Sequence, residues 1–202
     1  TSTIIKQIAL KEIDGCSIGK LRSYPPNLKG SFLGYYSNDV FFTWGKNSLD
    51  RINNSKNTID HILISGFPYI INNLDFNKKI IDIKNNFEKH GVEKIILILD
   101  TNHSKNNNFY FQYIPSDIIH FFYKTFIDLM YVDETIGLII KPKKNIIIDK
   151  LINTKQIINQ SLETKRCYLE EESFQIIPSC YADISDITIG IGSFISSALI
   201  EC

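Results

Sequence analysis

Residues 94–100 read KIILILD, a continuous apolar run closed by a lysine and an aspartate. Runs of this kind are typical of strands that are covered on both faces, as in parallel sheets with helices on either side. From residue 62 onward, similar short apolar runs alternate with longer segments of helical periodicity. The sequence therefore predicts an α/β fold: a Rossmann-like, mainly parallel sheet flanked by helices and built from βαβ units.

The expected elements follow from the hydrophobic periodicity of each segment and from the residues that end it. Strands are predicted at 62–65, 94–100, 136–140, 166–169, 174–177 and 187–189, and helices at 74–90, 115–133 and 145–162. Gly91 stops the first of these helices, and a further helix is expected to open at Ser193.

The first sixty residues are less regular than the rest. Residues 4–10 are predicted to form a strand, and residues 39–45 (DVFFTWG) an aromatic one. The polar stretch at 53–58 resembles a linker, so we expect a remnant of a preceding α/β domain at 1–58, with exposed apolar surface. A donor-nucleotide-binding domain is expected at 59–202. The single methionine, Met130, and the end at Cys202 inside a predicted helix suggest a fragment of a longer protein.

Composition excludes several classes of protein. The formal net charge is zero and no basic stripe is present, which argues against a nucleic-acid binder. The 4 cysteines are far apart, and the 4 histidines show no ligand spacing with them, so we expect neither a zinc site nor a disulfide scaffold. No apolar run reaches the ~18–20 residues of a membrane span, and residues 1–10 lack a signal peptide. We expect a reduced, cytoplasmic protein.

The segment 182–202 carries the main functional signal. An apolar strand at 187–189 leads into a turn with Gly190 and Gly192, and the helix that follows opens with Ser193, Ser196 and Ser197. The first N–H groups of a helix lack backbone partners and carry partial positive charge, so a strand that leads into a helix N-terminus can bind an anion. Glu201, one turn later, suits sugar hydroxyls. The alternative is an ordinary βα turn whose small residues let helix and sheet pack closely.

Two other strand exits carry suggestive residues. Gly66 and Pro68 follow the strand at 62–65, and Lys141, Lys143 and Lys144 surround Pro142 after the strand at 136–140. Lysines at such an exit can neutralise a diphosphate, although a solvated turn also explains them. Because all these elements are expected to be parallel, Gly66, Lys141, Gly192, Ser193 and Glu201 are predicted to line one cleft at the carboxyl ends of the strands. Asp100 and His103 follow the central strand and could touch a ligand or cap a loop.

Four segments in this order resemble a known superfamily: residues 39–45 (DVFFTWG), 62–68 (ILISGFP), 137–144 (GLIIKPKK) and 182–201. Together they resemble GT-B glycosyltransferases of bacterial surface-polysaccharide (capsule) assembly, over residues 36–202. They also resemble the polyol-phosphate transferases of teichoic acid synthesis and, more distantly, the nucleotide-sugar 2-epimerases.

The resemblance implies roles for particular residues. Ser193, Ser196 and Ser197 would face the donor phosphates, Glu201 would accept from ribose hydroxyls, and Lys141 or Lys144 would approach the pyrophosphate. The substrates would be a nucleotide-sugar donor and a saccharide acceptor, with no metal and no separate cofactor. The catalytic base usually lies in the N-terminal domain, so none is named, and the fragment alone is expected to be inactive. Peripheral membrane association of the full-length protein at the inner face of the membrane is left open.

One departure from the teichoic-type pattern separates the alternatives. Those enzymes usually carry a histidine after the lysine-proline exit, where this chain has Lys143 and Lys144. A sugar transferase therefore stands ahead of a polyol-phosphate transferase. The alternative of another class is a non-catalytic doubly wound binding or receiver domain. A receiver needs several acids at strand exits, whereas Asp100 alone follows a strand directly.

Overall fold

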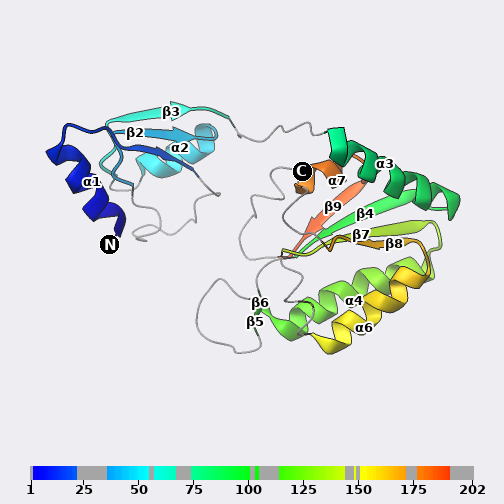
Figure 1. Ribbon diagram of the computed structural model, residues 1–202. Coiled ribbons are helices and arrows are strands. Elements are labelled where there is room, and N and C mark those ends of the chain that lie inside the picture. Colours follow the sequence, from blue (N-terminus) through cyan, green and yellow to red (C-terminus); the bar gives the residue numbers. More distant parts are fainter. Residues whose placement is uncertain are drawn as a thin grey trace. The chain divides into compact units, whose positions relative to one another are not determined.

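The computed structural model describes residues 2–21, 36–54, 57–66, 74–100, 103–104, 114–143, 148, 151–171 and 177–191. The chain divides into two compact units, Thr1–Ile70 and Ile71–Cys202, here called the first and the second unit (Figure 1). Each unit is an α/β assembly around its own parallel sheet, and each is described by itself.

The first unit is built on a three-stranded sheet in the order β1-β2-β3, with both pairs parallel. Its elements are α1 (Ser2–Glu12), β1 (Ile18–Lys20), β2 (Val40–Thr43), α2 (Lys46–Asn53) and β3 (His61–Ile64). Among the described residues of this unit, Leu21, Phe41 and Ile52 form a buried cluster, with Trp44 and Ile62 packed against them. The predicted aromatic strand is therefore confirmed as β2.

The prediction of a strand at residues 4–10 is wrong, because α1 covers this segment. Its composition explains the outcome: Gln7, Ala9, Leu10 and Lys11 are all good helix formers. Ile4 and Ile8 are spaced by one helical turn, so the same isoleucines that raise strand propensity also fit a helical face.

The first unit extends to Ile70, beyond the boundary expected near residue 58. The reason is that β3 pairs with β2 in parallel, from His61 opposite Val40 to Ile64 opposite Thr43. The polar stretch before β3 is an internal connection of this βαβ unit. Within it, the side chain of Asn57 accepts the N–H of Tyr36 at 2.6 Å and donates to the carbonyl of Ile52 at 2.8 Å.

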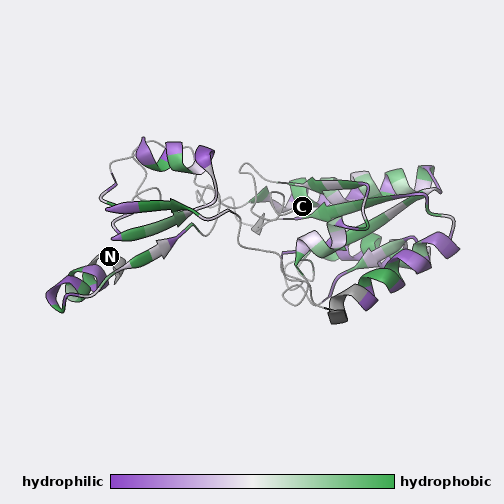
Figure 2. Ribbon diagram, turned by 90° about the horizontal axis from the view of Figure 1, so that it is seen from above, coloured by the Kyte–Doolittle hydropathy of each residue, from purple (hydrophilic) through white to green (hydrophobic). Residues whose placement is uncertain are grey.

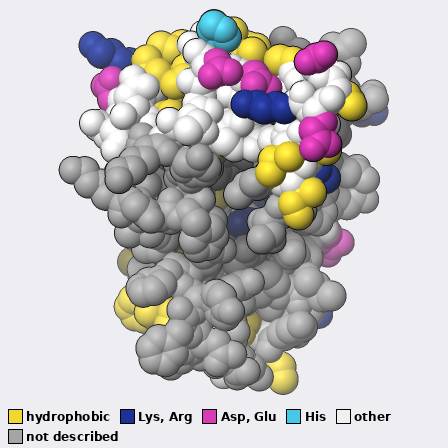
Figure 3. Space-filling view, turned by 90° about the vertical axis from the view of Figure 1, so that its left-hand side faces the viewer, with side chains coloured by type: hydrophobic (Ala, Val, Ile, Leu, Met, Phe, Trp, Pro, Cys, Tyr) yellow, Lys and Arg dark blue, Asp and Glu magenta, His cyan; other side chains and the backbone are white. Residues whose placement is uncertain are grey.

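Large apolar side chains are exposed on the first unit, as they also are at several positions of the second unit. Figure 3 shows hydrophobic side chains lying beside charged ones on the described surface. The exposed set comprises Ile5, Ile8, Ile13, Ile18, Leu63 and Ile64.

The second unit contains a four-stranded parallel sheet in the order β8-β7-β4-β9. Helices cover both of its faces: α4 and α6 on one side, α3 and α7 on the other (Figure 1). This arrangement confirms the predicted mixed α/β, Rossmann-like architecture. Its main elements are α3 (Leu74–Lys89), β4 (Lys94–Leu99), α4 (Ser116–Val132), β7 (Ile136–Lys141), α6 (Ile152–Glu163), β8 (Cys167–Leu169), α7 (Pro178–Ala182) and β9 (Ile187–Gly190), and a short parallel pair joins β5 (His103–Ser104) to β6 (Ile114–Pro115).

Strand β4 lies inside this sheet and contributes side chains to two apolar clusters. Ile96 and Ile98 pack with α4, α6 and β7, whereas Leu97 and Leu99 pack with α3 and α7. All residues of β4 after Lys94 are buried, as expected of a strand covered on both faces. Figure 2 shows the contrast between these apolar strands and the helices, which alternate between hydrophilic and hydrophobic residues.

Two expected elements are only partly covered by the described residues. Of the helix predicted at 145–162, α6 (Ile152–Glu163) confirms the later part and Ile148 is also helical, whereas residues 145–147 and 149–150 lie outside the described part of the chain. Of the strand predicted at 174–177, residues 174–176 lie outside the described part of the chain, and Ile177 is the N-cap of α7, a helix that was not predicted. Pro178 opens α7, a first-turn position that suits proline because the missing N–H would have no partner there. No helix in the described ranges is both long and apolar enough to cross a membrane.

We predict that Gly137→Ala destabilises the second unit by about 1–3 kcal/mol through overpacking. A Cβ at this position of β7 would lie 2.8 Å from Val92 Cγ1 and 3.2 Å from Phe87 Cδ2. Urea denaturation should show the loss, and Gly137→Ala/Val92→Ala should lose less than the sum of the single changes. Full additivity of the two changes in Gly137→Ala/Val92→Ala would contradict this packing.

Candidate functional site

The strand order of the second unit reverses beside β4. From β4 the chain passes to β7 and then β8 on one side, and it returns to place β9 on the other side of β4. Leu99, the last residue of β4, is therefore paired with both Lys141 of β7 and Gly190 of β9. The N–H of Ile191 then donates to the Leu99 carbonyl at 3.2 Å. In open α/β sheets, ligands bind outside the carboxyl ends of the strands at such a switch point.

Asp100 is the first residue beyond β4 at this switch point. Its Oδ2 accepts the hydroxyl of Tyr123 at 2.9 Å, and its Oδ1 accepts the backbone N–H of Lys143. Burial raises the pKa of Asp100 to about 6, against the opposing effect of these two hydrogen bonds and of the charges on Lys143 and Lys141. Tyr123 is fully buried, and burial together with the Asp100 carboxylate raises its pKa well above the usual value.

Lys141 ends β7, and only 5% of its surface is exposed. Ile139, two residues earlier, packs in the α3 and α7 cluster. Because side chains alternate along a strand, Lys141 lies on that same face and Asp100 on the α4 face. Lys141 is nevertheless close enough to Asp100 to lower the pKa of its carboxyl group. The structure thus brings together Asp100 and Lys141, two of the residues singled out at strand exits.

Glu170, the residue after β8, is a buried carboxylate that sequence reasoning missed. It is 0% exposed, and its N–H donates to the Ile140 carbonyl at 2.9 Å. The Lys79 ammonium lies 3.0 Å from its Oε2, the Tyr168 hydroxyl donates to it at 3.3 Å, and the Tyr181 hydroxyl also donates to it. Burial and the bond to Glu170 raise the pKa of Tyr181. The sequence shows only an acidic triplet at 170–172, which is usually solvated; tyrosines at strand and helix positions nearby were the available signal.

The remaining predicted site residues divide into two groups. Gly66 belongs to the first unit, where its φ of +75° gives a structural reason for glycine at the β3 exit. The rest lie outside the described residues, so the predicted single cleft stays a prediction: Lys144, Gly192, Ser193, Ser196, Ser197 and Glu201.

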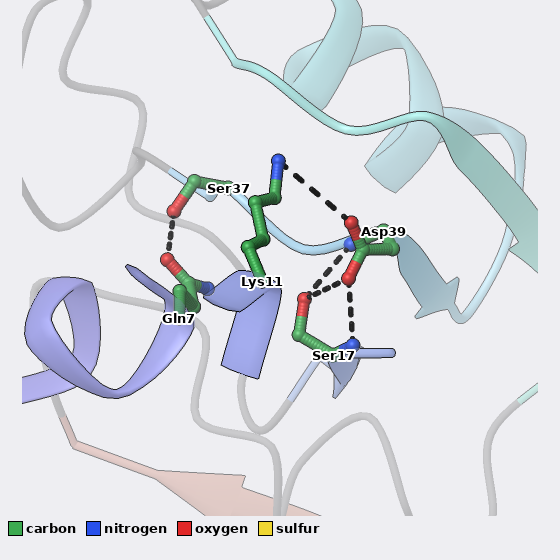
Figure 4. Close-up of polar contacts among 5 residues, drawn as sticks. All are labelled: Gln7, Lys11, Ser17, Ser37 and Asp39. Carbon is green, nitrogen blue, oxygen red and sulfur yellow. Dashed lines mark hydrogen bonds and ion pairs between the residues drawn. The ribbon is translucent and has the colours of Figure 1, made fainter. Parts of the chain in front are cut away.

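A second polar cluster, in the first unit, has a structural role (Figure 4). Asp39 Oδ2 accepts the N–H of Ser17 at 2.6 Å and its hydroxyl at 2.7 Å, while Lys11 Nζ lies 4.0 Å from Oδ1. The two Ser17 bonds lower the pKa of Asp39. Because Asp39 precedes β2, this cluster lies at the amino end of that strand. Together with the hydrogen bond from Ser37 to Gln7, it fastens α1 to the sheet.

A cavity of about 300 Å³ in the second unit lies at the opposite edge of its sheet from the switch point. Its lining includes Glu93, just before β4, and Asp186, just before β9. Asp186 Oδ2 accepts the N–H of Ile95 at 2.7 Å and so joins the amino ends of the two strands. Over the described ranges, no group of three or more His, Cys, Asp or Glu is arranged to hold a metal ion.

The switch point brings Lys141 and Lys143 beside a shielded carboxyl group, a set that can attract an anionic group and exchange a proton near neutral pH. No family model matches this chain, and no curated protein and no solved structure is significantly similar to it. A functional interpretation therefore depends on the geometry of this sheet edge and on the sequence that follows β9.

Proposed function

We propose that the second unit binds the diphosphate of a nucleotide-activated sugar at the carboxyl edge between β4 and β9. The intact protein would then be a glycosyltransferase-like enzyme that passes the sugar to a saccharide acceptor during surface-polysaccharide synthesis. The observation that carries the proposal is the reversal of strand order at Leu99, flanked by Lys141 and Gly190. In chain order the four strands read 3-2-1-4, the order of a dinucleotide-binding fold around its switch point.

The chemistry expected at this edge concerns the leaving group. When a glycosyl bond to a nucleoside diphosphate breaks, negative charge develops on the departing phosphate. Lysine charge from the β7 exit, hydroxyls of Ser193 and Ser197 and the N-terminus of the helix predicted after β9 would stabilise that charge. Removing one such donor typically raises a barrier by on the order of 3 kcal/mol. The second unit would thus bind the donor and stabilise the nucleoside diphosphate as it leaves.

We predict that Ser193→Ala/Ser197→Ala weakens nucleoside-diphosphate binding tenfold or more. Each hydroxyl that donates to a charged oxygen contributes about 1.5–3 kcal/mol, and 1.4 kcal/mol corresponds to a factor of ten. Calorimetric titration of the full chain with UDP, GDP, ADP and CDP measures the change. Glu201→Gln should instead weaken binding of the nucleoside diphosphate and leave binding of inorganic pyrophosphate unchanged, because Glu201 is proposed to accept hydrogen bonds from the ribose hydroxyls.

The matched control is Ser179→Ala/Ser185→Ala. Ser179 lies in α7 and Ser185 precedes β9, where its hydroxyl donates to the Tyr181 carbonyl at 2.7 Å. This variant removes two serines from the same unit at the other side of the sheet and should bind normally. Unchanged binding in Ser193→Ala/Ser197→Ala, or no binding of any of the four nucleotides by the unmodified chain, would rule the proposal out.

A further inference from the structure

The turn after β7 is tied to the end of β4 by one side chain. Pro142 is buried and has no backbone N–H, so the first donor of the turn beyond Lys141 is the N–H of Lys143. That N–H donates to Asp100 Oδ1, across 43 residues of sequence. The other oxygen, Oδ2, accepts the buried hydroxyl of Tyr123 from α4. Both carboxylate oxygens are therefore engaged, and the rotamer of Asp100 is fixed from two elements.

We propose that Asp100 is a positioning residue of the anion site: its carboxylate holds residues 141–143 in the conformation that presents positive charge at the switch point. This inference rests on the proposed function of the second unit. An aspartate in direct contact with a diphosphate would repel it. An aspartate that binds the backbone of the lysine turn instead shapes the site, and its charge is offset by Lys141 and Lys143.

The surroundings of Asp100 make its hydrogen bond with the Lys143 N–H dependent on pH. The titratable and charged groups that face it are Tyr123 from α4 and Lys141 and Lys143 from β7 and its exit. On the β9 side, Ile189 and Ile191 pack into the same apolar cluster as Tyr123. In this partly apolar setting the pKa of Asp100 is about 6. Below that pH the protonated carboxyl loses an acceptor site, and the bond to the Lys143 N–H weakens.

The decisive measurement is amide hydrogen exchange of Lys143 in the full chain, with and without UDP. In Asp100→Ala we expect the Lys143 amide to exchange about tenfold faster and UDP to bind about tenfold more weakly, as the loss of one hydrogen bond to a charged group implies. Asp100→Asn keeps one acceptor oxygen and should be intermediate. The terminal phosphate of UDP also titrates between pH 5 and pH 7.5, so the contribution of Asp100 is given by the ratio of UDP affinities of the unmodified chain and Asp100→Asn. This ratio should change across that range, because the asparagine side chain does not titrate.

Asp186→Ala is the matched control, since Asp186 makes the corresponding carboxylate bond to the Ile95 N–H at the other edge of the same sheet. It should speed exchange at Ile95 and leave Lys143 and UDP binding unchanged. Unchanged Lys143 exchange in Asp100→Ala, or equal acceleration in Asp186→Ala, overturns the positioning role alone. Normal UDP affinity in Asp100→Ala also overturns it and leaves the proposed function standing. Failure of the unmodified chain to bind UDP overturns the proposed function, and with it this inference.

Discussion

Asp100→Asn is expected to gain stability relative to the unmodified chain as the pH rises from 4 to 7. Burial raises the pKa of Asp100 from 3.8 to about 6 in the folded protein, so the folded state binds this proton more tightly than the unfolded state. The associated stability is fully present below about pH 4 and is lost as the pH rises through 6. Asparagine does not titrate, so the difference in unfolding free energy should change by on the order of 3 kcal/mol over this window.

Urea denaturation of both proteins at pH 4, 5, 6 and 7 gives this difference directly, because other titrating groups cancel between them. Any offset from the amide's lost acceptor oxygen is constant with pH. Asp133→Asn is the control of opposite sign: hydrogen bonds from Thr135 lower the pKa of Asp133. There the unmodified chain should lose stability relative to the variant as the pH falls. A flat difference for Asp100→Asn would show that its carboxyl group is not shielded from water.

Lys79→Met is expected to lower the unfolding free energy by about 2–4 kcal/mol at pH 7, because it removes the cation that lies 3.0 Å from the buried Glu170 carboxylate. The upper limit is below the loss seen for wholly buried pairs, since the Lys79 side chain is 38% exposed. Lys79→Met/Glu170→Gln should recover most of this loss. Glutamine carries no charge and still offers a carbonyl oxygen to the buried Tyr181 hydroxyl.

The pair formed by Lys124 and Asp128 provides the comparison. It is an (i, i+4) pair on α4 with both side chains more than half exposed, at 51% and 56%. Lys124→Met should therefore change the unfolding free energy by no more than about 0.5 kcal/mol. Equal losses in Lys79→Met and Lys124→Met, measured by urea denaturation, would show that Glu170 is as well solvated as Asp128.

The parts of the fold that could be predicted are those that local pattern determines. Residues 94–100 and 136–140 are apolar throughout because both faces of their strands are covered, and the sequence alone reveals this. The strand prediction at 4–10 was wrong because isoleucines occur on the apolar faces of strands and of helices alike. Strand β3 belongs to the first unit because it pairs with β2, on the other side of an intervening helix in the sequence. No local sequence pattern shows with which strand β3 will pair.

The candidate site was predictable to a similar depth. Strand exits identified Lys141 and Asp100, because ligands gather at the carboxyl ends of parallel strands. The partner of Asp100, Tyr123, sits in the middle of α4, where a tyrosine reads as ordinary core. Glu170 was hidden in an acidic triplet, since burial of one carboxylate among three depends on how α3 and α7 pack against the sheet. Hydrogen bonds between distant elements were the information that the sequence lacked.

The position of β9 beside β4 has a consequence for synthesis on the ribosome. Ile96 pairs with Ile187, so one side of β4 stays unpaired until the chain has grown by 91 further residues. At elongation rates of about 5–20 residues per second, this takes roughly 5–18 s. During that interval the nascent chain presents an open, strongly apolar strand edge, a template for pairing with other chains. Quality-control factors that shield such edges would meet this protein at that stage of translation, before β9 can close the sheet.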